Sequence, residues 1–124
     1  MPKKILIVDD EPSIIVPVQF LMEQNGYDVM VAFSGEEAME IIAEKKVDLI
    51  LLDIMLPVID GFEVCQRVRE NLQWNKIKII LLTALGSDAN VEKGLALGAD
   101  AYITKPFSNV DIVEKVKELL ENSE

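Results

Sequence analysis

Short runs of consecutive apolar residues alternate five times with amphipathic stretches along the 124-residue chain. Runs that are apolar throughout predict strands buried on both faces, whereas apolar residues three and four apart predict helices. The five predicted strands cover residues 5–8, 27–32, 47–52, 77–82 and 101–103. The five predicted helices cover residues 12–25, 34–45, 60–71, 88–97 and a last stretch that begins at 108.

Residues that start and stop helices support these boundaries. Gly26 and Gly98 follow the first and fourth helical stretches, where glycine commonly ends a helix. Ser34 precedes Glu37 by three residues, the spacing of a capping box, and Asp60 stands before the third helix. Pro17 lies within the first predicted helix and lacks the N–H that would bond the carbonyl of residue 13. A helix that already runs at Ser13 would lose up to ~3 kcal/mol or bend, and a start near Ile14 would avoid most of this cost.

Alternation of buried strands with helices predicts an α/β fold with a parallel sheet and helices on both faces. Right-handed crossovers then give a doubly wound five-stranded sheet, for which the flavodoxin-like strand order 2-1-3-4-5 is expected. No repeat, linker or low-complexity tract interrupts the pattern, so residues 1–124 are predicted to form a single domain.

Composition narrows the possible functions. Half of the residues are hydrophobic, which argues against intrinsic disorder, and the net charge of −10 disfavours direct binding to nucleic acid or to anionic membranes. The longest basic runs are Lys3–Lys4 and Lys45–Lys46, so no basic patch is evident in the sequence. Histidine is absent and Cys65 is the single cysteine, which excludes imidazole or cysteine metal sites and His-dependent catalysis. With neither a signal peptide nor an apolar run long enough for a bilayer, we expect a soluble, cytoplasmic protein.

In a doubly wound sheet, ligands bind beyond the carboxyl ends of the strands. Five polar side chains follow the first, third, fourth and fifth predicted strands: Asp9, Asp10, Asp53, Thr83 and Lys105. Carboxylates packed together repel one another unless a cation joins them, and an all-oxygen ligand set suits Mg²⁺. A carboxylate beside such an ion can act as a nucleophile toward phosphorus, with Lys105 and the Thr83 hydroxyl neutralising charge on the phosphoryl oxygens.

Four segments in this order resemble the receiver domain of bacterial two-component response regulators, and of chemotaxis regulators in particular. They are ILIVDDE (5–11), LILLDIMLPVIDG (49–61), LLTA (81–84) and GADAYITKPF (98–107), and the likeness extends over essentially the whole chain. The resemblance implies that Asp53 is the phosphoacceptor and that Asp9, Asp10, Asp53 and the backbone carbonyl of Met55 bind Mg²⁺. It also implies that Thr83 and Tyr102 form a conformational switch, that Lys105 pairs with the phosphoryl group, and that the Lys105–Pro106 peptide is cis.

The same resemblance implies a sensor histidine kinase or histidine phosphotransfer protein as donor, which the first helix of receivers usually contacts. A downstream protein or a fused output domain would read the signal, and the chain would be a signalling domain that catalyses only its own phosphorylation and slow dephosphorylation. Ala101 and Lys115 depart from the pattern of receivers that dimerise through the last strand and its flanking helices.

Three other functions are conceivable for such a fold. An FMN-binding electron carrier would need phosphate-binding donors after the first strand, where Asp9, Asp10 and Glu11 would repel a phosphate. A phosphatase of the dehalogenase type would place its nucleophile after the first strand in an Asp-x-Asp pattern and add a cap domain. A pseudo-receiver that only binds proteins stays the main alternative, although Asp10, Asp53, Thr83 and Lys105 are all intact.

Overall fold

The computed structural model describes residues 2–121 and contains the ten elements that the sequence predicts. The strands are β1 (Lys4–Val8), β2 (Asp28–Ala32), β3 (Leu49–Leu52), β4 (Lys78–Thr83) and β5 (Ala101–Thr104). The helices are α1 (Pro12–Gln24), α2 (Gly35–Glu44), α3 (Gly61–Glu70), α4 (Asp88–Ala96) and α5 (Asn109–Glu121). Strand β4 extends one residue further than predicted and includes Thr83.

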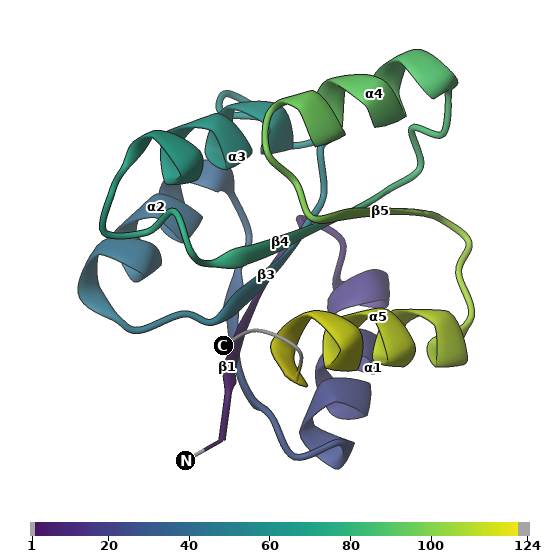
Figure 1. Ribbon diagram of the computed structural model, residues 1–124. Helices are drawn as coiled ribbons and strands as arrows, with labels where there is room; N and C mark the ends of the chain where they lie inside the picture. The colour runs from purple at the N-terminus through teal and green to yellow at the C-terminus, as the bar shows by residue number, and fades with distance from the viewer. Residues whose placement is uncertain (1, 122–124) are drawn as a thin grey trace.

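All five strands are parallel and lie in the order β2-β1-β3-β4-β5, which confirms the predicted fold class and strand order. Helices α1 and α5 cover one face of the sheet, and α2, α3 and α4 lie on the other (Figure 1). Because β1 and β3 are neighbours while their following helices lie on opposite faces, the carboxyl ends of these two strands border the crevice expected in this topology.

Alternate residues of the buried strands supply two separate cores. Leu6 and Val8 of β1 pack toward α2 and α3, together with Leu52 of β3 and Val64 of α3. Ile5 and Ile7 point the other way, where apolar residues of α1 and α5 cover them. Burial on both faces explains why these strands are continuous apolar runs.

The helix ends form as the sequence indicates. Ser34 Oγ accepts a hydrogen bond from the Glu37 N–H at 3.1 Å, and Asp60 Oδ1 accepts one from the Glu63 N–H at 2.9 Å. Gly26 and Gly98 have φ of 89° and 108°, a backbone conformation that side chains disfavour. Within residues 2–121 none of the helices combines the length and the apolar character that crossing a bilayer requires.

Pro17 lies inside α1, which begins at Pro12 and not near Ile14. The carbonyl of Ser13 therefore lacks its partner within the helix. Ser13 and Pro17 are both exposed, so water can bond this carbonyl and the cost stays small.

Candidate phosphoacceptor and metal site

The ladder of parallel strands continues one residue beyond β1 and β3 and fixes the first two site residues. The Asp9 N–H donates to the Ala32 carbonyl at 3.1 Å, and the Asp53 N–H donates to the Val8 carbonyl at 2.9 Å. These bonds hold the two aspartates side by side at the carboxyl edge of the sheet. Only 2% of Asp9 and 4% of Asp53 is exposed.

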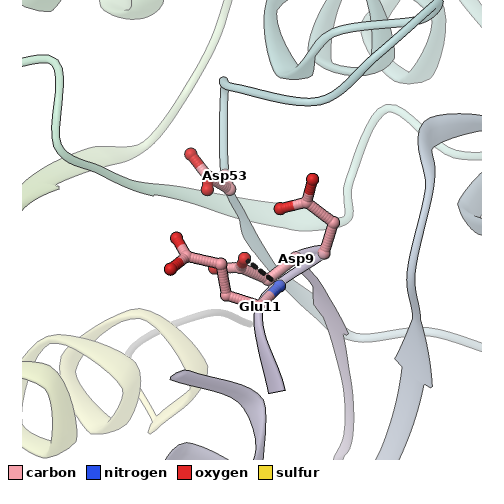
Figure 2. A group of neighbouring side chains, drawn as sticks. Asp9, Glu11 and Asp53 are labelled. Atoms are coloured by element: carbon pink, nitrogen blue, oxygen red, sulfur yellow. Dashed lines mark hydrogen bonds between the residues drawn. The ribbon is translucent and has the colours of Figure 1, made fainter. Parts of the chain in front are cut away.

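Four acidic residues gather at this edge, and Figure 2 labels three of them. Asp9, Asp10, Glu11 and Asp53 each offer a carboxylate oxygen, and these oxygens all lie within 4.8 Å of one another. The Glu11 N–H donates to Asp9 Oδ1 at 3.0 Å, which turns the chain so that Glu11 joins the group (Figure 2). Asp9 and Asp53 are buried, whereas Asp10 and Glu11 are exposed.

Lys105, from the loop after β5, brings an ammonium group into this cluster. Its Nζ lies 2.9 Å from Asp9 Oδ2, 3.2 Å from Asp53 Oδ2 and 3.9 Å from Glu11 Oε1. Burial alone would lower the pKa of Lys105, but the hydrogen bond to Asp9 and the charges of Asp53 and Asp9 outweigh it and raise the pKa. Lys105 is thus held as a cation. The Lys105–Pro106 peptide bond is cis, as expected.

The donor set fits a hard divalent cation. Four carboxylates face one ammonium, so the cluster keeps a net negative charge that Lys105 does not cancel. All the ligand atoms are oxygens, which favours Mg²⁺ or Ca²⁺ over softer metals. Because Asp10 and Glu11 are exposed, the cluster is open to solvent on one side and leaves room for metal-bound water or a substrate oxygen.

The loop after β3 packs tightly around Asp53. Its Oδ1 accepts a hydrogen bond from the Met55 N–H at 3.0 Å, which places the backbone of Met55 beside the carboxylate. Gly61 begins α3 so close to this loop that an added Cβ would lie 2.4 Å from the Asp53 carbonyl oxygen. Any side chain at Gly61 would push on the Asp53 backbone.

Thr83 and Tyr102 meet the same short backbone segment after β4. The Thr83 hydroxyl oxygen accepts from the Leu85 N–H at 3.4 Å, and the Tyr102 hydroxyl donates to the Leu85 carbonyl oxygen. Burial, and secondarily the charge of Asp53, raises the pKa of Tyr102. Among the described residues, the Thr83 hydroxyl makes no hydrogen bond to the carboxylate cluster. Leu85 links the two predicted switch residues.

The structure therefore brings Asp9, Asp10, Asp53 and Lys105 into one cluster, with Met55 against Asp53. Thr83 and Tyr102 form a second group on β4 and β5. Two further residues contribute that the sequence motifs do not predict. Glu11, which is not in the predicted ligand set, reaches the cluster, and Leu85 contributes through its backbone, which no side-chain pattern reveals.

Comparison with known proteins assigns this fold and site to a class. A profile of the response regulator receiver domain matches residues 5–117. The chain belongs to the response regulator receiver domain family, as the sequence motifs indicated.

Comparison with an individual protein also indicates a response regulator. The chain is 48% identical over 124 residues to the alkaline phosphatase synthesis transcriptional regulatory protein PhoP of Bacillus subtilis (strain 168). This match covers 100% of the chain and 51% of that protein, so the chain spans about half the length of this curated relative.

Solved structures give the same result. A CheY-like receiver domain protein from Methanospirillum hungatei JF-1 superposes with a TM-score of 0.91 at 36% identity, covering 98% of this chain and 95% of that one. A BeF3-activated DrrB receiver domain gives 0.90 at 35% identity, covering 98% and 100%.

Proposed function

We propose that residues 1–124 form one receiver domain that accepts a phosphoryl group on Asp53 from a histidine kinase or a histidine phosphotransfer protein. The observation that carries this proposal is the setting of Asp53. It is a buried carboxylate within reach of Lys105 Nζ at 3.2 Å and of three further carboxylates, and it lies next to the exposed Asp10 and Glu11. A buried aspartate with a purely structural role would be balanced by a cation of its own. Asp53 instead shares the ammonium of Lys105 with Asp9, so the negative charge of the pair is only partly balanced.

The chemistry is a phosphoryl transfer. A carboxylate oxygen of Asp53 attacks phosphorus, a new P–O bond forms, and the P–N bond to the donor imidazole breaks and leaves the imidazole on the partner. The Lys105 ammonium offsets the charge on the phosphoryl oxygens. The Thr83 oxygen accepts from Leu85, so its hydroxyl proton stays available to donate to one of these oxygens.

Mg²⁺ is the proposed cofactor, held by Asp9, Asp10, Asp53 and the backbone carbonyl of Met55. When bound, it neutralises carboxylate and phosphoryl charge during transfer. Asp10 is the exposed member of the adjacent acid pair, while Asp9 already bonds Lys105 and the Glu11 N–H, so Asp10 is the better direct ligand.

Helix α1 offers a surface for the phosphoryl donor. It begins at Pro12, directly after the acidic residues, and exposes 64% of Val16 and 61% of Phe20. Residues four apart lie on the same face of a helix, so these two side chains offer neighbouring apolar surface to a partner. A partner helix that carries phosphohistidine could pack on this face and present its imidazole to Asp53.

The phosphorylated domain would act through a downstream protein or a fused output domain. The relative from Bacillus subtilis is named as a transcriptional regulatory protein, which supports an output in gene control for a response regulator of this type. We expect a cytoplasmic phosphoprotein of a two-component system.

The test is incubation with acetyl phosphate and Mg²⁺ followed by intact mass measurement. The wild type should gain one phosphoryl group, and Asp53→Asn should gain none. Asp88→Asn, which makes the same change at an exposed site on α4, is the matched control and should behave like the wild type. A wild type that gains no phosphoryl group from acetyl phosphate or from any phosphohistidine donor would instead support the alternative, a pseudo-receiver that only binds proteins.

A further inference from the structure

The amino-terminal edge of the sheet, opposite the carboxylate cluster, gathers much of the positive charge of the chain. Six of the twelve Lys and Arg residues lie there, in three segments far apart in sequence: Lys3, Lys4, Lys45, Lys46, Lys76 and Lys78. The first pair precedes or begins β1, the second follows α2, and the third stands on either side of the start of β4. No basic patch is visible in the sequence because the fold assembles it from these three segments.

A groove of about 430 Å³ opens at this edge, and we call it the lysine groove. The residues that line it include one acidic residue, Asp48, and five lysines: Lys3, Lys45, Lys46, Lys76 and Lys78. Asp48 is already engaged, since its Oδ2 accepts from the Lys4 N–H at 2.8 Å and its Oδ1 lies 3.9 Å from Lys46 Nζ. Among the described residues, Lys3, Lys45, Lys76 and Lys78 pair with no carboxylate.

The groove also has an aromatic and apolar lining. Trp74 is half-buried and packs against the core, and it lines the groove with Val47 and Ile77. Within residues 2–121 the indole N–H of Trp74 has no hydrogen-bond partner. Gln73, which is exposed, also lines the groove. A planar ring can therefore stack or pack on Trp74 while polar atoms on its edge meet Gln73.

We propose that the lysine groove binds a nucleoside polyphosphate, with the base against Trp74 and the phosphates among the lysines. Several unpaired ammonium groups around one hollow match a ligand with several negative charges on adjacent phosphates. The size of the groove falls in the usual range for a small-molecule site. This inference goes beyond the proposed phosphoacceptor function and does not depend on it.

A small ligand fits the charge distribution better than a nucleic acid. A compact polyphosphate bound in the groove interacts mainly with the nearby lysines, because salt screens its interaction with charges beyond about 8 Å. A long polyanion would extend past the groove over a protein whose net charge is −10, and would be repelled there.

Trp74 is the single tryptophan of the chain, so its fluorescence reports on this groove alone. Titration with ATP in EDTA, which removes Mg²⁺ from the carboxylate cluster, should change the emission saturably with half-saturation below about 1 mM. Adenosine should give no saturable change at these concentrations. Inorganic tripolyphosphate should compete with ATP.

Two double variants with the same net charge give the decisive comparison. Lys45→Gln/Lys76→Gln should weaken ATP binding at least about tenfold, whereas Lys115→Gln/Lys117→Gln on α5 should bind like the wild type. By calorimetry, Trp74→Leu should weaken ATP binding but leave tripolyphosphate binding unchanged. Phosphorylation by acetyl phosphate, measured on every variant, should stay normal and reports separately on Asp53 and on folding.

Three results would overturn the proposal. They are the absence of saturable ATP binding, equal weakening in the two double variants, and a single-stranded oligonucleotide that binds more tightly than ATP and depends on Lys45 and Lys76. The last result would assign the groove to nucleic acid.

Discussion

Lys105 Nζ lies 3.2 Å from Asp53 Oδ2, although the two residues are 52 positions apart in the chain. The same ammonium lies 2.9 Å from Asp9 Oδ2, so one cation is shared between two buried carboxylates. Lys105 thus offsets only part of the repulsion in a cluster of four acids. The remaining negative charge accounts for the expected need for Mg²⁺.

Mg²⁺ should therefore stabilise the fold, and Asp10 should be required for this effect. An ion that binds only the native state adds about 2.7 kcal/mol at a hundredfold excess over its Kd. Asp10→Asn should raise the metal-free stability, because it removes one repelling charge, and should abolish most of the Mg²⁺-dependent rise in Tm. Thermal melts with Mg²⁺ and with EDTA measure both effects.

The matched control is Asp111→Asn, which removes one charge from an exposed position on α5. It should keep the wild-type response to Mg²⁺. If Asp10→Asn kept that response as well, Asp10 would not be a ligand.

Val58 should be a source of strain in the loop that follows Asp53. Its φ is 66°, where a β-branched residue is strongly disfavoured, and 87% of it is exposed, so little packing compensates. Val58→Asn should raise the free energy of unfolding by about 1 kcal/mol, because asparagine tolerates this conformation. Val58→Ala, which keeps a Cβ but tolerates the region less well than asparagine, should gain less. Urea unfolding of the wild type and the two variants measures these differences in the free energy of unfolding. A Val58→Asn variant that is less stable than the wild type would contradict this explanation.

Most of the fold could be predicted from sequence because local signals and burial agree. Continuous apolar runs marked strands covered on both faces, and Ser34, Asp60, Gly26 and Gly98 marked helix ends. The start of α1 at Pro12 also agrees with the predicted helix, because Ser13 and Pro17 are exposed and water can replace the backbone hydrogen bond that the proline removes.

Four side chains of the candidate site, Asp9, Asp10, Asp53 and Lys105, could be predicted to meet, since parallel strands bring their carboxyl ends to one edge. The Glu11 side chain was not part of this prediction. The backbone contributors of the site could not be predicted. Leu85 acts through its N–H and carbonyl, which any residue would offer. The lysine groove was equally hidden, since it depends on which turns the strand order places side by side.

Phosphorylation should be transmitted from Thr83 to Tyr102 through Leu85. If the Thr83 hydroxyl turns toward the phosphoryl group, its bond with the Leu85 N–H is disturbed, and the Leu85 carbonyl that Tyr102 bonds shifts with it. Addition of beryllofluoride and Mg²⁺ should then change the amide NMR shifts of Leu85, of Tyr102 and of α5.

Thr83→Ala should confine the shift changes to the Asp53 pocket. Thr104→Ala, the same change at the exposed end of β5, should leave the full response in place. A full response in Thr83→Ala would show that the coupling takes another route.

Stability should fall as the pH rises above about 9. Burial raises the pKa of the Cys65 thiol above 9.0, and the pKa values of Tyr27 and Tyr102 are raised above 10.0. The unfolded chain releases these protons at lower pH than the native state, so the native state binds more protons and loses stability as pH increases. Urea unfolding midpoints measured between pH 7 and 11 test the loss of stability, and the absorbance of tyrosine phenolate in the native protein tests the raised pKa values. Phenolate formation at the same pH in native and unfolded protein would contradict this prediction.

The most direct test of the central claim is to map the acceptor. Protein treated with acetyl phosphate and Mg²⁺ is reduced with sodium borohydride, which converts an aspartyl phosphate to homoserine, and is then digested for peptide mass analysis. We predict conversion at Asp53 alone, and none when acetyl phosphate is omitted. Conversion at Asp9 or Asp10, or a phosphoryl group that survives on serine or threonine while Asp53 stays unmodified, would contradict the assignment.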